Sequence, residues 1–292
     1  MTQIGAGYLY LDDGSQVNDG TQTGAQENVG VRVVCDPSPY RIGDFLVITG
    51  ISSCFRTPSG AVARRVLARS RDDIVAVQLG NEAFGSIGAL KRTALGRNVT
   101  LHAGVVTASA EQMGGFMYVE DTGRASGIRV ATTDPRGLGD EVSVSGSLEY
   151  AESGELQVGN GTTAFLRAVD PLTALGLHVA ALGGGPFGVQ PGVIGGSGLN
   201  NLGLLIRVAG EVTFVDPGGQ FLTVWDGSSL AALPPSDPDG HVGVRVNAPA
   251  MIPPGLEVGD FVSVSGISSC TTVGENLHPL VRARSSGDIQ RL

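Results

Sequence analysis

The sequence contains few of the residues on which most catalytic and nucleic-acid-binding sites depend. Only one of its 19 Lys and Arg residues, Lys91, is a lysine, and the excess of Asp and Glu gives a net charge of −9. Because non-specific binding to phosphate backbones draws its affinity from basic clusters, this charge argues against a generic nucleic-acid coat. The three cysteines and four histidines show neither the spacing of a zinc site nor an HExxH motif. We therefore expect no catalytic residue, no metal ion, no cofactor and no enzymatic activity.

Long apolar runs are also missing. No run approaches the ~18 residues of a membrane-spanning helix, and no basic stretch followed by an apolar one precedes residue 30. The chain as given therefore shows neither a membrane span nor a secretory signal. It does have 45 glycines, 15 prolines and 41% hydrophobic residues. This composition favours short strands, many turns and substantial cores.

One unit of sequence recurs three times. Its copies share an apolar strand that ends in an acidic residue, a Gly-[Ile/Val]-Arg-Val strand, a Gly-Asp turn, and a glycine seven residues after the first glycine of that turn. These features lie, copy by copy, at residues 8–13, 30–33, 43–44 and 50; at 116–121, 127–130, 139–140 and 146; and at 221–226, 243–246, 259–260 and 266. A constant spacing in three copies indicates a duplicated structural unit.

Apolar and polar residues alternate after each Gly-Asp turn. The apolar positions are Leu46 and Ile48, Val142 and Val144, and Val262 and Val264. This period of two predicts a half-buried strand. The arginines of the Gly-[Ile/Val]-Arg-Val strands alternate with valines in the same way, so Arg32, Arg129 and Arg245 are expected to point outward.

The repeated unit predicts an all-β chain of three tandem five-stranded barrels of the oligonucleotide/oligosaccharide-binding (OB) type, the first barrel lacking its own first strand. The pattern Gly-x-Val-Thr, aromatic-x-x-Val-x-Asp, Gly-[Ile/Val]-Arg-Val and Gly-Asp-x-Val-x-Val-[Ser/Thr]-Gly resembles the OB-fold repeats found in arrays in secreted bacterial proteins. Residues 198–207, leading into 210–213, resemble the joint between such repeats. The resemblance covers nearly the whole chain. It implies a fold, a tandem arrangement and an extracellular or cell-surface location, and it carries no catalytic residue.

The repeats set the expected domain boundaries. Barrel 1 covers residues 1–78, a joint 79–98, barrel 2 residues 99–168, a Gly-rich joint 169–203, and barrel 3 residues 204–292. Residues 79–85 and 182–188 are alike and carry Leu and Phe, so both joints are expected to be ordered rather than flexible. The apolar stretch 175–182 is not assigned to any barrel.

The cysteines permit one disulfide. Cys35 follows the third strand of the first copy and Cys54 follows the fourth, so we expect a bond that closes a loop of about twenty residues and stabilises the fold by roughly 3 kcal/mol. Two thiols in a reducing cytoplasm are the alternative. Cys270 is left over, and we expect either a free buried thiol or an intermolecular bond.

The aromatic residues of the second strands lie on one side of them. They are Tyr8, Tyr10, Phe116, Tyr118, Phe221 and Trp225. These rings are expected to fill the barrels or to pack against the joints. If they were instead exposed beside Arg32, Arg129 or Arg245, they would stack on sugars or on single-stranded nucleic acid. A polysaccharide- or nucleic-acid-binding module is therefore the alternative function, and the acidic charge disfavours nucleic acid.

The first copy lacks its opening strand. In the other copies this strand covers about residues 99–107 and 204–213, whereas only residues 1–7 precede the second strand of the first copy. An open barrel presents unpaired N–H and C=O groups, which recruit another strand. The expected assembly edge is the second strand, Tyr8, Leu9, Tyr10 and Leu11.

These observations predict a structural subunit that binds copies of itself and no membrane. A segment of a neighbouring copy would complete the first barrel and give an extracellular homopolymer or filament. The expected donor is the stretch 175–182 or the C-terminal 289–292. A third reading is that the sequence is part of a longer product, whose missing strand lies before Met1.

Overall fold

The computed structural model describes residues 1–13, 15, 17–44, 46–76, 82–228 and 239–292. It confirms an all-β structure of several sheets, with 48% of the residues in strands and 6% in helices. The chain divides into two compact units, Met1–Gly80 and Asn81–Leu292, which we call the N-terminal unit and the C-terminal unit. No helix among the described residues is long and apolar enough to cross a membrane.

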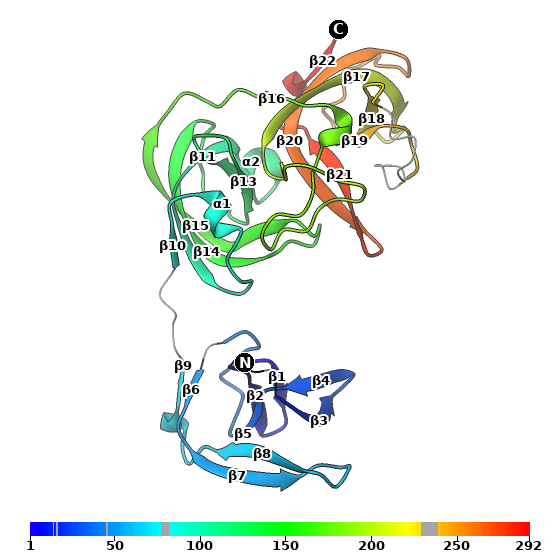
Figure 1. Cartoon of the computed structure of the whole chain (residues 1–292). Coiled ribbons are helices and arrows are strands. Elements are labelled where there is room, and N and C mark those ends of the chain that lie inside the picture. Colours follow the sequence, from blue (N-terminus) through cyan, green and yellow to red (C-terminus); the bar gives the residue numbers. More distant parts are fainter. Residues whose placement is uncertain (14, 16, 45, 77–81, 229–238) are drawn as a thin grey trace. The chain divides into compact units, whose positions relative to one another are not determined.

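The first part of the C-terminal unit is a closed sheet, which we call the middle sheet (Figure 1). It consists of β10 (Glu82–Phe84), β11 (Asn98–Ala108), β12 (Met117–Glu120), β13 (Gly127–Val130), β14 (Asp140–Tyr150) and β15 (Leu156–Ala168), with the short helices α1 (Ile87–Leu90) and α2 (Ala110–Met113). Its strand order is β10-β11-β12-β13-β15-β14, and β14 also pairs with β11. The pairing of β11 with β14 closes the sheet.

The second part of the C-terminal unit is a closed sheet of the same order, which we call the C-terminal sheet. It consists of β16 (Leu175–Gly176), β17 (Leu205–Val215), β18 (Phe221–Trp225), β19 (Val244–Asn247), β20 (Phe261–Val273), β21 (Asn276–Arg282) and β22 (Ile289–Arg291). The order is β16-β17-β18-β19-β21-β20-β22, and β17 also pairs with β20. The long strands β11 and β17, which correspond to the first strand of the predicted repeat, therefore each pair with three others.

The predicted alternation places the valines of the fourth strands in the cores. Val142 and Val144 in β14 and Val262 and Val264 in β20 are fully buried, and the serines between them are half-buried. One apolar cluster fills the middle sheet and a second fills the C-terminal sheet. Burial of these side chains is the main favourable contribution to folding of the C-terminal unit.

The N-terminal unit has the same strands in a less complete arrangement. It consists of β1 (Gln3–Gly5), β2 (Tyr8–Leu11), β3 (Asn18–Thr23), β4 (Gln26–Val29), β5 (Val31–Val34), β6 (Leu46–Ile48), β7 (Ile51–Arg56), β8 (Val62–Leu67) and β9 (Ile74–Ala76). They form a five-stranded sheet of order β1-β2-β5-β8-β7, the pair β6-β9 and the hairpin β3-β4. Among the described residues of this unit, no pairing closes the sheet.

The stretch 175–182 belongs to the C-terminal sheet, where it matches residues 83–90 of the middle sheet. β16 runs parallel to β17 as β10 runs parallel to β11. The short helices that follow have the same cap, because Asp226 accepts a hydrogen bond from Val179 N and Asp121 accepts one from Ile87 N, both at 2.8 Å. The prediction that residues 79–85 and 182–188 are equivalent joints is therefore wrong for residues 82–85, which correspond to the start of the stretch 175–182 instead. Residues 79–81 lie outside the described residues.

The repeated glycine, which follows β6 as Gly50 and lies inside β14 as Gly146 and inside β20 as Gly266, is required by a close approach to the fifth strand. A Cβ atom would lie 2.5 Å from Leu67 O at Gly50, 2.5 Å from Gly159 O at Gly146, and 2.6 Å from Arg282 O at Gly266. Real Cβ atoms do not come this close to backbone oxygens, so the seven-residue spacing reflects a steric requirement.

Replacing Gly266 by Ala should destabilise the C-terminal unit by about 1–3 kcal/mol, the usual cost of forcing an extra methyl group into packed structure. The matched control is Gly176→Ala, because a Cβ there meets nothing within 4 Å. Urea unfolding followed by the fluorescence of Trp225, the one tryptophan, measures both variants. Equal stabilities for the two would contradict the steric account.

Candidate functional site

The predicted assembly edge, Tyr8 to Leu11, is not an edge. These residues form β2, which pairs with β1 on one side, as in Gln3↔Tyr10, and with β5 on the other, as in Tyr10↔Arg32. The prediction is wrong because residues 1–5 turn back and cover this strand. The unpaired part of the sheet therefore lies in another strand.

Met1 stands in the position that Val212 occupies in β17. The Met1 carbonyl oxygen accepts a hydrogen bond from Gly43 N at 2.9 Å, and its ammonium donates to Asp44 O at 2.7 Å. In the C-terminal sheet the same two bonds join Val212 to Gly259 N at 2.9 Å and to Asp260 O at 2.7 Å. Residues 1–5 thus supply the last part of the first strand, and nothing described in this unit takes the place of Leu205–Glu211.

Strand β6 is therefore unpaired on one side within the described part of the unit. It pairs with β9 from Leu46↔Ala76 to Ile48↔Ile74, whereas the matching part of β20 pairs with both β22 and β17. Thr49 N donates to Asp73 O on the β9 side at 2.7 Å. Because successive residues of a strand point their backbone groups to opposite sides, those of Leu46 and Ile48 face away from β9. We call β6 together with Ile51 the open edge.

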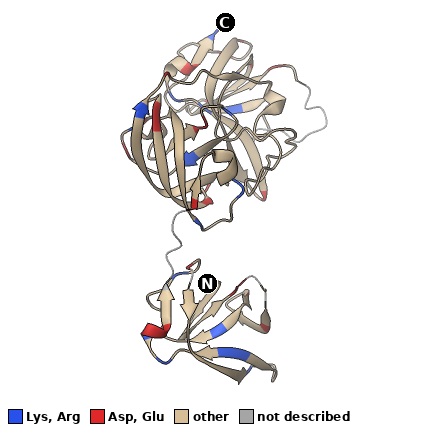
Figure 2. Cartoon of the chain, turned by 60° about the vertical axis from the view of Figure 1, so that its left-hand side comes forward, with Lys and Arg blue, Asp and Glu red and all other residues tan. Residues whose placement is uncertain are grey.

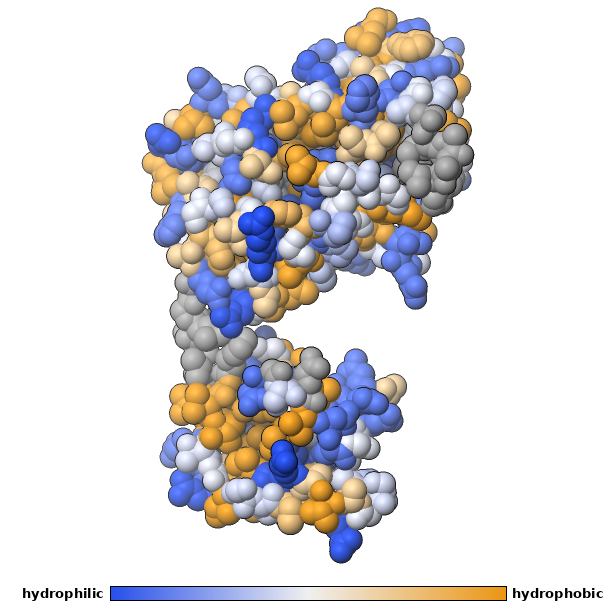
Figure 3. Space-filling view, viewed as in Figure 1, coloured by the Kyte–Doolittle hydropathy of each residue, from blue (hydrophilic) through white to orange (hydrophobic). Residues whose placement is uncertain are grey.

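Apolar side chains are exposed at the open edge. Ile51 is 56% exposed, whereas Ile267, its counterpart in β20, is fully buried. Val47 in β6 is also largely exposed. Figure 3 shows hydrophobic side chains at the surface of the N-terminal unit. An unpaired strand flanked by exposed apolar residues is a typical site for addition of another strand.

The predicted disulfide is wrong, because Cys35 and Cys54 are both free thiols. The strand order β5-β8-β7 places β8 between them, and the register sets Cys54 opposite Arg64 while Cys35 follows the residue opposite Leu67. The two positions therefore differ by about four residues along the strands and by two strand spacings, roughly 16 Å in total, beyond the ~7 Å limit for a disulfide. Cys270 is buried and free, and burial raises the pKa of its thiol.

The predicted ligand face is arranged differently from an open stacking surface. Each arginine of the Gly-[Ile/Val]-Arg-Val strands lies over an aromatic ring of the second strand. Arg32 lies 3.9 Å from the Tyr8 ring, Arg129 lies 3.7 Å from Phe116, and Arg245 lies 3.6 Å from Phe221. Trp225 is half-buried, and its Nε1 donates to Ser228 O at 3.3 Å. In the view of Figure 2, Lys and Arg are scattered among Asp and Glu over the described part of the chain.

The two closed sheets meet through a buried polar network. Tyr118 in the middle sheet and Ser269 in the C-terminal sheet both donate hydrogen bonds to Glu155 Oε2 at 2.8 Å. Arg282 Nε donates to Ser269 Oγ at 2.9 Å. Burial raises the pKa of Tyr118, so its hydroxyl stays a donor. Because buried polar groups are costly unless bonded, this network fixes one way for the two sheets to pack.

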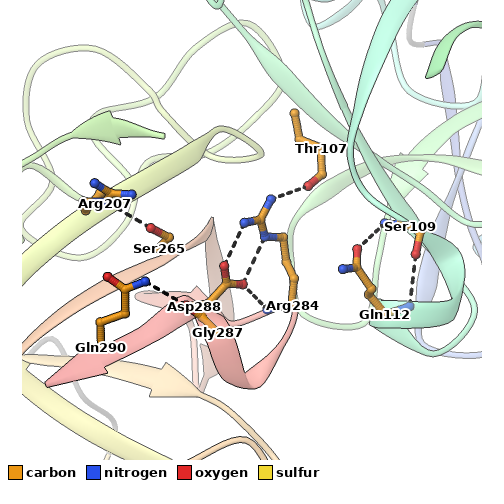
Figure 4. A network of polar contacts seen from close by, with 9 residues as sticks. All are labelled: Thr107, Ser109, Gln112, Arg207, Ser265, Arg284, Gly287, Asp288 and Gln290. Carbon is orange, nitrogen blue, oxygen red and sulfur yellow. Dashed lines mark hydrogen bonds and ion pairs between the residues drawn. The ribbon is translucent and has the colours of Figure 1, made fainter. Parts of the chain in front are cut away.

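Arg284 makes a second contact across the same boundary. Its guanidinium is held by Asp288, at 2.7 Å, and donates to the carbonyl oxygen of Thr107 at 2.9 Å (Figure 4). Thr107 is the bulged residue of β11, skipped in the pairing between Val106 and Ala108. The bulge leaves its carbonyl oxygen available to a partner outside the sheet.

A third contact joins the start of β17 to the middle sheet. The carboxylate of Glu120 accepts a hydrogen bond from Leu205 N, and Arg124 donates to Leu205 O at 3.4 Å. A Cβ atom on Gly203 would overlap the backbone of Gly127, so these two segments of the chain touch through glycines. Glycines at both positions permit this approach.

The sequence pattern singled out Tyr118, but it did not identify the other polar residues at this boundary. Lys91 was visible only as the single lysine, yet it is fully buried, and its Nζ donates to Leu202 O at 3.0 Å. Asn201, in the segment resembling an inter-repeat joint, accepts hydrogen bonds from Gly183 N at 2.8 Å and Ser268 Oγ at 2.7 Å. That resemblance was the one signal in the sequence for this boundary.

The described residues hold no group of three His, Cys, Asp or Glu side chains placed to bind a metal ion. A comparison with protein-family models and with curated proteins found no match to this chain.

Burial makes the boundary between the two closed sheets sensitive to pH. It raises the pKa of Glu120 from 4.5 to about 7, so the folded protein binds a proton that the unfolded chain releases between these values. Stability should therefore fall as pH rises from about 4.5 to about 7, by about 3 kcal/mol for this group. Burial also lowers the pKa of Lys91 from 10.5 to about 8, so stability should rise again between about 8 and 10.5.

Glu120→Gln tests this, because the amide accepts the bond from Leu205 N without titrating. Relative to wild type, the variant should gain stability between pH 5 and 8 in urea unfolding followed by Trp225. The control is Glu141→Gln, since Arg167 lowers the pKa of Glu141 to below this window. Parallel stability profiles for wild type and Glu120→Gln would refute the assignment.

Proposed function

We propose that the chain is a non-enzymatic structural subunit that assembles with copies of itself into an extracellular homopolymer, through strand addition at the open edge. In this proposal the three sequence repeats are OB-type barrels, and the first is completed by a segment of a neighbouring copy. The strand order shared by the two closed sheets supports the barrel type, since five strands close through contacts of the first with the second and the fourth.

The observation that carries the proposal is the unpaired side of β6. Buried or partly buried backbone N–H and C=O groups are almost always bonded, so an edge next to exposed apolar side chains favours a partner strand. The incoming strand would run antiparallel to β6, as Leu205–Glu211 runs along β20. Main-chain bonds would supply affinity, and alternate side chains would enter the core.

Neither donor expected from the sequence is free in this chain. Residues 175–182 pair with β17 through β16 and bury Val179 and Leu182 in the C-terminal sheet. Ile289–Arg291 form β22, which pairs with β20. Donation of either segment would be an exchange, in which the donor copy opens its own sheet. Both β16 and β22 are short and lie at an end of the sheet, but β22 buries only Ile289 in the core, whereas residues 175–182 bury both Val179 and Leu182. The β22 strand is therefore the easier of the two to release.

The ligand-binding alternative has weaker support. An arginine already covers one face of the Tyr8, Phe116 and Phe221 rings. Tyr10 and Tyr118 are fully buried. The half-buried Trp225 is the aromatic residue of this set that remains for a polysaccharide or single-stranded nucleic acid to stack on.

The proposal predicts concentration-dependent assembly of the purified full chain. Sedimentation velocity and negative-stain microscopy should show a growing series of oligomers or filaments. A synthetic peptide with the sequence of residues 203–212 should bind the open edge and shorten the assemblies, because it reproduces the strand that pairs with β20.

The control peptide carries Asp in place of Ile206 and Val208, whose side chains face the core in β17. It should leave the assemblies unchanged, because a carboxylate cannot enter the apolar interior. A chain that stays monomeric at high concentration, with a folded N-terminal unit, would rule out the proposed function.

A further inference from the structure

The same four residues stand in two different environments in this chain. Ile51-Ser-Ser-Cys54 begins β7, and Ile267-Ser-Ser-Cys270 occupies the same place in β20. Ile267, Ser268, Ser269 and Cys270 are fully buried. Ile51, Ser52 and Cys54 are exposed. Burial of the second tetrapeptide comes from contact with the middle sheet and its joint.

The contacts made by the buried tetrapeptide show what its surface binds. Ile267 packs in one cluster with Ala108 and Tyr118 of the middle sheet. Ser269 Oγ donates to Glu155, and Cys270 Sγ lies 3.8 Å from Ser153 O. These residues therefore form a surface that docks a repeat onto the repeat before it.

A neighbouring ion pair is repeated as well. Arg69 is held by Asp73 at 2.7 Å, as Arg284 is held by Asp288 at 2.7 Å. The side chain of Arg69 is 62% exposed, whereas that of Arg284 is 15% exposed, because Arg284 also donates to Thr107 O. The ion pair with Asp73 orients Arg69 as Asp288 orients Arg284. Among the described contacts of Arg69, no carbonyl oxygen takes the place of Thr107 O.

We infer that the surface around the start of β7, with Ile51, Ser53, Cys54 and the nearby Arg69, docks onto the C-terminal sheet of a second copy of this chain. The inference rests on the proposed function, and it names the partner surface that accompanies strand addition. The open edge and this face are continuous, since Ile51 belongs to both. Docking here would repeat, between copies, the contact that joins the two closed sheets within one copy.

Two positions of the surface that the middle sheet uses have counterparts in the C-terminal sheet. Thr213 is the bulged residue of β17, as Thr107 is of β11, so its carbonyl oxygen is the expected acceptor for Arg69. Trp225 pairs with Glu211 as Glu120 pairs with Val105, which places Trp225 at the position that contacts the docked repeat. The contact is head-to-tail, so it propagates rather than closing on itself unless its rotation makes a ring.

Two reporters already in the chain test the inference. Alkylation of Cys54 by iodoacetamide, read by peptide mapping, should slow about tenfold or more as the full chain assembles, because an exposed thiol becomes covered. Acrylamide quenching of Trp225 should fall over the same range of protein concentration.

The outcomes separate this inference from the proposed function. Assembly with Cys54 still as reactive as in the monomer, or with Trp225 quenching unchanged, overturns the docking surface and leaves strand addition standing. Protection of Cys54 at every concentration shows that its own chain covers it, which also overturns the inference. Absence of assembly contradicts the proposed function itself.

Two variants provide a further test of the docking surface. Ile51→Glu should raise the dissociation constant for assembly about 100-fold or more, because the counterpart Ile267 is fully buried. Val75→Glu is the matched control, since Val75 is also 56% exposed and its counterpart Gln290 stays exposed in the C-terminal sheet. Equal assembly of the two variants would contradict the inference, provided that circular dichroism shows both to be folded.

Discussion

Each closed sheet in this chain depends on one antiparallel pairing, between its long first strand and its fourth. β11 pairs with β14 and β17 pairs with β20, and each pairing satisfies a row of backbone groups while bringing apolar residues of the first strand into the core. In the N-terminal unit, Met1 reaches the last position of this pairing, and the described residues leave the rest of β6 without a partner. The proposed assembly follows from this single constraint.

The repeated Ile-Ser-Ser-Cys sequence shows that the environment of a sheet surface is set by its partner. In the C-terminal sheet the tetrapeptide is buried against Tyr118 and its neighbours, and in the N-terminal unit most of it is exposed. In the proposed assembly, the contact within one chain is the template for a contact between copies.

The sequence predicted the features that depend on local pattern. The side of each strand that faces the core follows from side-chain alternation, and the repeated glycine follows from steric fit, as Gly266 shows. It did not predict features that depend on distant partners. The disulfide was wrong because β8 separates Cys35 from Cys54, and β6 rather than β2 is the open strand because residues 1–5 fold back. Glu155, bonded to Ser269 at a separation of 114 residues, follows no local pattern.

Hydrogen exchange at the amides of Leu46 and Ile48 reports whether a strand is added at the open edge, because these groups face the side of β6 that has no partner among the described residues. Strand addition predicts fast exchange in dilute monomer and strong protection in concentrated, assembled protein, with the amides of β17 protected in both states. Exchange at Leu46 and Ile48 that is equally fast in monomer and assembly would show that no strand is added there.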